Sequence, residues 1–365
     1  MTNLASGAEA EPSTEEFAVV ADRESGLDRI GLVLRLNSGQ YVVQGVDHNS
    51  GNPASDFSDS TNKRGETVLC TLRGNLRKNL VYSTSGSRPR RVTRAKQPLN
   101  HDNVAVGDRV RYRIIDAGSE GVIEELLPRT SRFARTSFRG AEQTLVTNLD
   151  QLIIVFACAE PNPDLWRIDR WLVAAASNGI EPVLIANKRD KVDDAAFNAA
   201  FGEFQRIGYR VLATCARTGL GVDQLQDQLL GKVSAFTGPS GVGKSSLLNA
   251  IQPGLKLATG DIGDVTFKGR HTTTVRELIP LDCGGWVADT PGLRQLEMLR
   301  MNRDELILSF DEFVAHVEQA CRFRDCRHDN EPGCNIKRAV ESGHISRRRY
   351  ESFLQLAKEC ELPGR

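Results

Sequence analysis

The sequence predicts a multidomain α/β protein, and three observations along its 365 residues predict that fold class. Short apolar runs with period-two alternation fill residues 30–127, without a convincing helix, as in a small barrel. From about Leu145, continuous apolar runs alternate with segments of helical spacing, the pattern of a doubly wound parallel sheet. Beyond residue 300, helical patterns flank a cluster of cysteines and a histidine. We therefore expect an N-terminal OB-type β-barrel, a doubly wound sheet domain and a mostly helical C-terminal domain.

The composition is that of an ordinary globular protein. Hydrophobic residues make up 40% of the chain, and 47 Lys and Arg balance 47 Asp and Glu. Eight cysteines without a secretion signal are better interpreted as thiols or metal ligands than as disulfides. No apolar run approaches the ~20 residues of a membrane span, and the N-terminus resembles neither a signal peptide nor a transit peptide. We expect a cytoplasmic protein that does not associate with a membrane.

The expected domain boundaries follow changes in composition along the chain. The first 30 residues carry seven Asp/Glu against two Arg and lack apolar periodicity, so we interpret residues 1–28 as a disordered acidic tail. The barrel is expected over residues 29–128, the sheet domain over 129–299 and the C-terminal domain over 300–365.

A basic surface is expected on the barrel. Between residues 61 and 113 the chain carries thirteen Lys/Arg and three Asp/Glu, an excess that suits a polyanionic partner, although a solvated charged surface is the alternative. In the strand expected over 108–114, period two places three arginines on one face, and the connection 83–97, expected as a Ser/Pro-rich loop, adds others. RNA is favoured over DNA, because the barrel contains no helix-turn-helix or zinc-finger reader. The candidate RNA-binding residues are Arg88, Arg90, Arg91, Arg94, Arg109, Arg111 and Arg113.

A phosphate-binding loop lies between the apolar run 233–236 and a helical pattern that begins at Lys244. Its spacing is G-x-x-x-x-G-K-S, in which the glycines let successive N–H groups point into one concavity. Lys244 can reach the β- and γ-phosphates, and Ser245 can ligate Mg²⁺ at the positive end of the helix. The alternative is an ordinary glycine turn, which the strand and helix context disfavours. The candidate residues are Gly238, Pro239, Ser240, Gly241, Val242, Gly243, Lys244, Ser245 and Ser246.

A second motif follows the strand expected at 182–186 and has the N-K-x-D pattern of guanine recognition. The Asp190 carboxylate can accept hydrogen bonds from guanine N1–H and the 2-amino group, whereas adenine offers neither donor. Lys188 can lie along the base, Asn187 can tether neighbouring loops, and the Ala216 N–H can bond guanine O6. The motif is specific only in this context, because N-K-x-D alone often occurs in ordinary turns. The candidate base-binding residues are Asn187, Lys188, Arg189, Asp190, Cys215 and Ala216.

The motif Asp-Thr-Pro-Gly at residues 289–292 follows the apolar run 286–288. Asp289 would hold Mg²⁺ through water, and the Gly292 N–H would sense the γ-phosphate. Of the three threonines at 272–274, we expect Thr273 to complete the Mg²⁺ shell. The guanine motif precedes the phosphate loop, which precedes the threonines and Asp289. This order predicts a circularly permuted P-loop GTPase whose last motif leads directly into the C-terminal domain.

On these motifs the chain resembles the ribosome small-subunit-dependent GTPase A family (RsgA, also YjeQ), over roughly Ile30 to Leu356. The resemblance implies an OB fold, a permuted GTPase that binds GTP or GDP with Mg²⁺, and a zinc domain. It also implies binding to the 30S subunit and its 16S rRNA in late assembly, with stimulated hydrolysis coupled to release of the protein and of ribosome-binding factor A. We expect a monomer. Cys215 departs from the Ser or Thr usual before Ala216, and residues 47–64 look specific to the lineage.

The catalytic residue is expected at His271. Hydrolysis needs an oriented water, but the position after residues 289–292, where many GTPases place a glutamine, is Leu293, which cannot orient water. His271 precedes the threonines and is the candidate, and the resemblance implies the same role. An exposed loop histidine is the alternative.

The C-terminal domain contains a metal-ligand pattern. Cys321, Cys326, His328 and Cys334 fall within fourteen residues. Three thiolates and an imidazole suit tetrahedral Zn²⁺, and four protein ligands leave no open position, so we expect one structural zinc ion rather than scattered buried cysteines. One amphipathic helix is expected over 306–317, and a final helix around residues 350–357 could dock on RNA or cap the domain.

These predictions combine into a GTP hydrolase that is stimulated by the small ribosomal subunit and uses hydrolysis to leave it. The alternative from another class is a nucleotide-gated RNA-binding regulator with incidental hydrolysis. An ATP-dependent enzyme is disfavoured by Asp190.

Overall fold

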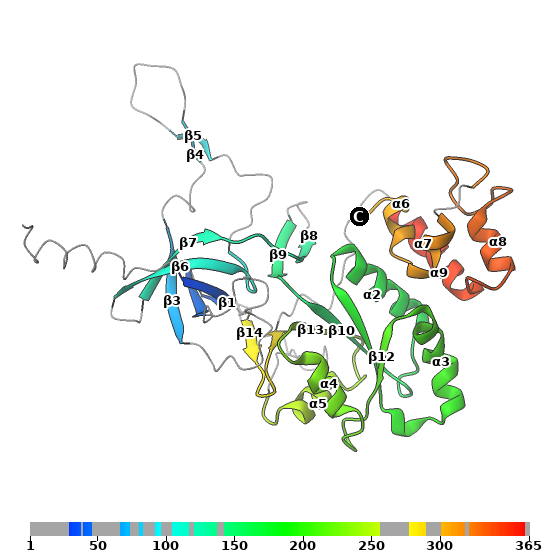
Figure 1. Cartoon of the computed structure of the whole chain (residues 1–365), viewed down its shortest axis with the longest axis horizontal. Helices are drawn as coiled ribbons and strands as arrows, with labels where there is room; N and C mark the ends of the chain where they lie inside the picture. The colour runs from blue at the N-terminus through cyan, green and yellow to red at the C-terminus, as the bar shows by residue number, and fades with distance from the viewer. Residues whose placement is uncertain are drawn as a thin grey trace, which may run out of the picture.

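A computed structural model of the chain describes residues 29–37, 39–45, 66–73, 80–82, 92–95, 104–116, 120–136, 142–255, 277–289, 301–317 and 321–361. Within these residues, eleven strands form one sheet that runs from the barrel through the second domain (Figure 1). None of the helices in these ranges combines the length and the apolar character needed to cross a bilayer. The expected acidic tail, residues 1–28, lies outside the described residues.

The N-terminal barrel has the five strands that the alternation predicts. They are β1 (Arg29–Asn37), β2 (Gln40–Gly45), β3 (Thr67–Leu72), β6 (Arg109–Asp116) and β7 (Glu120–Leu126). The strands pair in the order β1-β2-β3-β7-β6, and β6 returns to β1, which closes the barrel. Alternate side chains such as Val33, Val43 and Ile123 are fully buried inside it. The OB-type expectation is confirmed.

Two short hairpins lie outside the barrel. One pairs β4 (Leu80–Tyr82) with β5 (Val92–Ala95), so the connection 83–97 that was expected as a loop contains a strand. The other pairs β8 (Arg132–Thr136) with β9 (Glu142–Thr147), a pairing that the sequence analysis did not anticipate. Val146 in β9 forms an isolated bridge with Val106, so this second hairpin is attached to the segment that leads into β6.

The second domain is a doubly wound sheet, as expected. Its strands are β10 (Gln151–Ala157), β11 (Glu181–Asn187), β12 (Arg210–Ala213), β13 (Val233–Thr237), β14 (Glu277–Pro280) and β15 (Trp286–Asp289), in the order β12-β11-β10-β13-β15-β14. The first five in this order are parallel, and β14 is antiparallel to β15. The chain winds outward from β10 through β11 to β12 and then returns to the other side of β10 with β13. Ligands bind where such an order reverses, at the carboxyl ends of the strands.

Helices cover both faces of this sheet (Figure 1). They are α2 (Leu165–Ser177), α3 (Asp194–Ile207), α4 (Val222–Leu229) and α5 (Lys244–Ile251). All seven side chains of β10 are buried, and they alternate between two cores. Ile154 and Phe156 pack with residues of α2 and α3, whereas Ile153 and Val155 pack with residues of α4 and α5. Burial on both faces explains why β10 is continuously apolar in the sequence.

The barrel and the second domain are joined by strand pairing. Strand β1 of the barrel is antiparallel to β14, with Arg35 opposite Glu277, and these two side chains also form an ion pair. Next to this seam, the Trp286 ring N–H donates to Gln44 Oε1 at 3.2 Å. The barrel is therefore attached to the edge of the sheet at which β14 lies.

The C-terminal helices are α6 (Arg303–Leu308), α7 (Asp311–Val317), α8 (Asn335–Glu341) and α9 (Arg347–Glu361). The single helix expected over 306–317 is wrong, because the chain turns at Ser309 and Phe310 between α6 and α7. The turn lets Phe310 and Phe313 enter the same core as Phe353, with ring centroids 5.0 to 5.8 Å apart. Burial of three rings outweighs the continuity of one helix.

A buried ion network holds α9 against the second domain. Arg349, whose side chain is 1% exposed, donates to Asp169 of α2 at 2.7 Å and to both oxygens of Glu312 at 2.6 and 3.0 Å. Arg348 donates to the other oxygen of Asp169 at 2.6 Å. The Asp169 carboxylate is completely buried, and these two arginines supply its buried hydrogen-bond donors.

Replacing Arg349 should destabilise this attachment. Arg349→Ala leaves Asp169 and Glu312 without their buried cation, and breaking such a network costs about 3–5 kcal/mol. The matched control is Arg347→Ala, because the Arg347 side chain is 86% exposed and its pair with Glu351 is worth under about 1 kcal/mol. Urea unfolding followed by tryptophan fluorescence measures both, since Trp166 packs against the C-terminal core. Equal midpoints for the two variants would contradict this role of the network.

Candidate functional site: a guanine nucleotide pocket and a metal cluster

The phosphate loop leaves the carboxyl end of β13, which lies beside β10. Gly238 has φ +135°, and a Cβ there would lie 2.1 Å from the carbonyl oxygen of Val155 in β10. Gly243 has φ +96° and precedes the first residue of α5. Only glycine tolerates these positions, because the backbone is left-handed and the neighbouring strand is close. The loop is thus held against the central strand with its N–H groups at the start of a helix.

Lys244 lies over this loop. Its ammonium group donates to the carbonyl oxygens of Gly238 at 2.9 Å and Pro239 at 2.6 Å. The side chain therefore bends back over the concavity in which phosphates bind in such loops. The next two residues, Ser245 and Ser246, are exposed on the first turn of α5.

Asn187 joins the guanine motif to the phosphate loop. It ends β11, and its side-chain N–H donates to the carbonyl oxygen of Val242 at 2.8 Å. Its Oδ1 accepts from the Thr214 hydroxyl at 3.2 Å, which links the end of β12 to the same point. Asn187 is 1% exposed, so both contacts are shielded from water. The two motifs lie 55 residues apart in sequence and touch in space.

The Asp190 carboxylate has a partner on each oxygen. The Cys215 thiol donates to Oδ1 at 2.9 Å, and the Arg217 guanidinium donates to Oδ2 at 2.6 Å. The hydrogen bond from Cys215 makes the largest contribution to lowering the pKa of Asp190, and the hydrogen bond from Arg217 makes the next largest. The group is therefore a carboxylate at neutral pH. The Arg217 side chain is 80% exposed, whereas that of Asp190 is 21% exposed. An exposed cation thus covers one oxygen of a partly buried anion.

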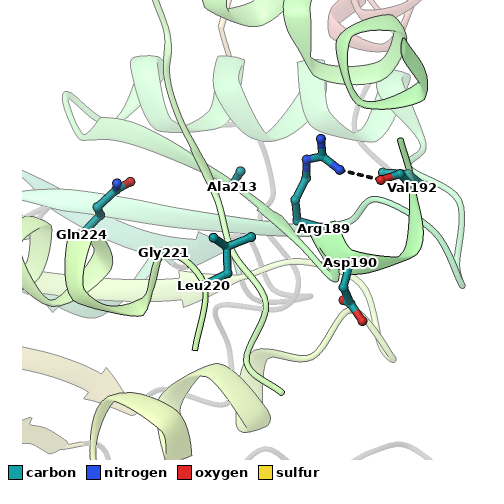
Figure 2. Close-up of a pocket in the computed structure, with 7 residues that line it drawn as sticks. All are labelled: Arg189, Asp190, Val192, Ala213, Leu220, Gly221 and Gln224. Carbon is teal, nitrogen blue, oxygen red and sulfur yellow. Dashed lines mark hydrogen bonds between the residues drawn. The ribbon is translucent and has the colours of Figure 1, made fainter. Parts of the chain in front are cut away.

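Lys188 and Arg189 point to different neighbours. The Lys188 backbone is left-handed, with φ 58°, and its ammonium donates to the Glu160 carbonyl in the loop after β10. The Arg189 guanidinium lies over the Phe197 ring at 4.9 Å and donates to the Val192 carbonyl and to Asp194. Figure 2 shows Arg189 and Asp190 directed to opposite sides of the chain. Binding of a nucleotide by the Arg189 side chain stays a prediction.

A pocket of about 490 Å³ adjoins Asp190 (Figure 2). It is lined by residues 189, 190 and 192 on one side. The other side is lined by the end of β12, the connection after it and the first turn of α4, including Ala213, Leu220 and Gln224. Residues 238–246 do not line it. The pocket therefore lies beside the expected base site at the carboxyl ends of β11 and β12, and the phosphate loop does not contribute to it.

The Mg²⁺ side of the site is described only in part. Asp289 is the last residue of β15, and β15 pairs in parallel with β13, so Asp289 lies at the same sheet edge as the phosphate loop. The predicted residues His271, Thr273 and Gly292 lie outside the described residues. Their roles stay predictions.

The four predicted metal ligands come together. Ligand atoms of Cys321, Cys326, His328 and Cys334 all lie within 4.8 Å of one another. His328 Nδ1 lies 3.6 Å from the sulfur of Cys321 and 3.4 Å from that of Cys334. The Asn335 N–H at the start of α8 donates to the Cys321 sulfur at 3.3 Å. The donor set and its spacing fit a tetrahedral ion of the size of Zn²⁺.

Burial shifts the pKa values of three of the four predicted metal ligands. Burial raises the pKa of the Cys326 thiol to about 12 and also raises that of Cys334, so a cation is needed for these groups to be thiolates. Burial lowers the pKa of His328, which favours the neutral imidazole that binds metals. The Tyr350 hydroxyl of α9 donates to the His328 carbonyl at 2.8 Å and fixes the loop against the last helix.

The predicted arginine face of the barrel is partly neutralised. Arg111 pairs with Glu125 at 3.1 Å, and Arg113 pairs with Glu124 at 3.2 Å. Burial lowers the pKa of Arg109, while the negative charge of Asp150 raises it. Arg88, Arg90 and Arg91 lie outside the described residues, and for Arg94 only the backbone is described, within β5. RNA binding by these seven arginines stays a prediction.

Two residues of this site were missed in the sequence. Arg217 covers the Asp190 carboxylate, and its position directly after Cys215-Ala216 was the available signal. Glu160 contacts Lys188 through its carbonyl and Lys191 through its carboxylate. Nothing in the spacing indicates Glu160, because a backbone carbonyl can come from any residue type.

Comparison with known proteins finds the RsgA GTPase family over residues 126–299. A "Small ribosomal subunit biogenesis GTPase RsgA" of Moorella thermoacetica is 45% identical over 253 residues, which cover 69% of this chain and 83% of the relative. A protein of the same description from Gemmatimonas aurantiaca is 42% identical over 293 residues, 78% of this chain and 94% of the relative.

Solved structures agree with this comparison. The crystal structure of YjeQ from Thermotoga maritima is 34% identical with a TM-score of 0.69, covering 93% of this chain and all of that one. YloQ, described as a circularly permuted GTPase, is 28% identical with a TM-score of 0.66, covering 93% and 98%. In this chain, too, the order of motifs is permuted, because the guanine motif precedes the phosphate loop. With its guanine motif and phosphate loop joined at Asn187 and with relatives that match most of its length, the chain belongs to the RsgA GTPase family.

Proposed function

We propose that the protein is a cytoplasmic GTPase that binds the small ribosomal subunit during late assembly, hydrolyses GTP there, and thereby drives release of itself and of an assembly factor. The contact between Asn187 and Val242 supports this proposal, because it joins the predicted guanine motif to the predicted phosphate loop. The relatives described as small ribosomal subunit biogenesis GTPases support the choice of partner.

In the proposed pocket, guanine bonds the Asp190 carboxylate in place of Arg217. Guanine N1–H and the 2-amino group need the acceptor positions of Asp190, while the Cys215 thiol can stay on Oδ1 and keep the carboxylate oriented. Arg217 is free to move because its side chain is largely exposed. The Ala216 N–H bonds guanine O6. Base binding thus exchanges one charge-assisted partner of Asp190 for another.

The phosphates lie on residues 238–246, and Lys244 turns from its loop carbonyls to the β- and γ-phosphates. Mg²⁺ would be held by Ser245, Thr273 and, through water, Asp289, and the Gly292 N–H would contact the γ-phosphate. His271 orients the attacking water. Electrostatic stabilisation by the loop N–H groups, Lys244 and Mg²⁺ supplies most of the catalysis.

The proposed output follows from what lies next to these γ-phosphate contacts. Thr273 lies four residues before Glu277, the first residue of β14, which pairs with β1 of the barrel. Gly292 follows Asp289 of β15 and leads into the C-terminal helices. A change at the γ-phosphate therefore acts on both attached parts, which we delimit as the barrel 29–128 and the zinc domain 300–365 around the GTPase domain 129–299.

Base selection by Asp190 is tested with one substitution. Asp190→Asn should weaken GTP binding by about 10²-fold or more and improve xanthosine triphosphate binding, because an amide can donate to the second carbonyl of xanthine. Competition against a fluorescent nucleotide measures both affinities. Asp194→Asn is the control, since its side chain is 92% exposed and pairs only with Arg189 among the described residues. An unchanged preference of the Asp190→Asn variant for GTP would contradict the proposal that Asp190 selects the base.

GTP turnover with and without purified small subunits tests the function as a whole. We expect strong stimulation by small subunits and little by free RNA, whereas a nucleotide-gated regulator would show none. His271→Ala should lower the stimulated rate by about 10²-fold, with GTP affinity near that of the native protein. His316→Ala in α7 is the matched control. A stimulated rate that survives His271→Ala would refute the catalytic assignment and leave the partner assignment standing.

The metal cluster should hold one zinc ion per chain. Cys334→Ser should lose the zinc and lower the unfolding midpoint of the C-terminal helices, because binding energy of a structural metal is folding energy. Cys283→Ser is the control, as Cys283 is a half-buried thiol in the turn between β14 and β15. Metal analysis of protein purified without chelator gives the stoichiometry. Protein without zinc and with an unchanged midpoint would contradict the site.

A further inference from the structure

The segment between the first two metal ligands exposes an aromatic ring. Phe323 is 41% exposed, and it is the one aromatic among the large hydrophobic side chains that are exposed in the described part of the chain. The others, such as Leu220 and Leu308, lie in different segments, so Phe323 does not belong to a contiguous apolar patch along the chain. An exposed ring offers a flat face on which another planar group can stack.

The neighbours of this ring are cationic. Arg322, Arg324 and Arg327 are all exposed, against one exposed acid in the same stretch, Asp325. The Arg322 guanidinium lies over the Phe323 ring, 5.6 Å from its centroid. The nearby Glu331 carboxylate faces the backbone, where it accepts from the N–H groups of Arg327 and Asp329 at 3.0 Å. The exposed surface of residues 322–327 therefore combines an aromatic ring with a net positive charge.

The segment is also held in place. Cys321 and Cys326 fix its two ends at the metal cluster. The Arg322 N–H donates to the Gly333 carbonyl at 3.2 Å, and Gly333, with φ +75°, allows that approach because a Cβ there would lie 3.0 Å from the Cβ of Arg322. Binding of a ligand to Phe323 therefore costs little conformational entropy, because the loop is already ordered. In Figure 1 the helices α7 and α8, on either side of this segment, lie at the end of the molecule opposite the barrel.

We propose that residues 322–327 form a stacking platform on which an unpaired RNA base lies against Phe323 while the arginines contact neighbouring phosphates. Aromatic rings beside guanidinium groups are the common means of binding single-stranded nucleic acid. A base inside a duplex has both faces covered by its stacked neighbours. This segment contains no second exposed large hydrophobic residue that could form the apolar core of a protein interface. The proposal rests on the proposed function only for the identity of the natural RNA, which is that of the small subunit.

The test measures binding of the full-length, zinc-loaded protein to small subunits and to a single-stranded RNA oligonucleotide, with a duplex of the same sequence for comparison. Phe323→Leu keeps an apolar side chain but removes the ring, and it should weaken binding to subunits and to the single strand by about five-fold to a hundred-fold. Phe323→Tyr should bind within about two-fold of the native protein. Leu308→Ala, at another exposed hydrophobic residue, is the control and should change nothing. Zinc content and unfolding midpoint show that each variant is folded.

Salt dependence separates stacking from charge. Arg324→Gln should lower the slope of log affinity against log salt by about 0.7 to 1, whereas Phe323→Leu should leave that slope unchanged. Single-strand binding equal to that of the duplex, or Phe323→Leu binding like the native protein, would overturn the proposal. Loss of subunit binding alone, with RNA binding intact, would assign the surface to a ribosomal protein and overturn it as well. Failure of the native protein to respond to small subunits would instead contradict the proposed function, and the oligonucleotide measurement would still decide this inference.

Discussion

Strand β10 is the constraint on which the nucleotide pocket depends. It pairs in parallel with β11 on one side and with β13 on the other, and all its side chains are buried. The guanine motif leaves the end of β11, and the phosphate loop leaves the end of β13. Because both strands are parallel to β10 and in register with it, their carboxyl ends lie at the same end of the sheet, where the Asn187 side chain donates to the Val242 carbonyl. The spatial arrangement therefore does not depend on which motif comes first in the chain.

The permutation changes what the sheet is attached to. In this chain, β14 and β15 come last among the strands of the second domain. Each connects the region around the predicted nucleotide site to another part of the protein. Strand β14 pairs with the barrel through β1, and the chain after β15 continues into helices that the Arg349 network holds against α2. Two parts at opposite ends of the molecule are thus connected to the two segments that would contact the γ-phosphate (Figure 1).

The sequence predicted what depends on local pattern. Alternation identified the barrel strands, continuous apolar runs identified β10 and β11, and motif spacing identified the phosphate loop and the metal cluster. It could not predict contacts that depend on tertiary packing. The break between α6 and α7 depends on Phe310 packing with Phe353, which lies 43 residues away in sequence (353 − 310). The cover of Arg217 on Asp190 and the neutralisation of Arg113 by Glu124 likewise need the fold to be known.

A structure determined with bound GDP tests the central claim, that one pocket is assembled from motifs in permuted order. The account predicts guanine N1 and the 2-amino nitrogen within about 2.7–3.2 Å of the Asp190 oxygens, with Arg217 displaced from Oδ2. The same structure should place the β-phosphate among the N–H groups of residues 238–246. Phosphates held in that loop with the base far from Asp190 would contradict the account.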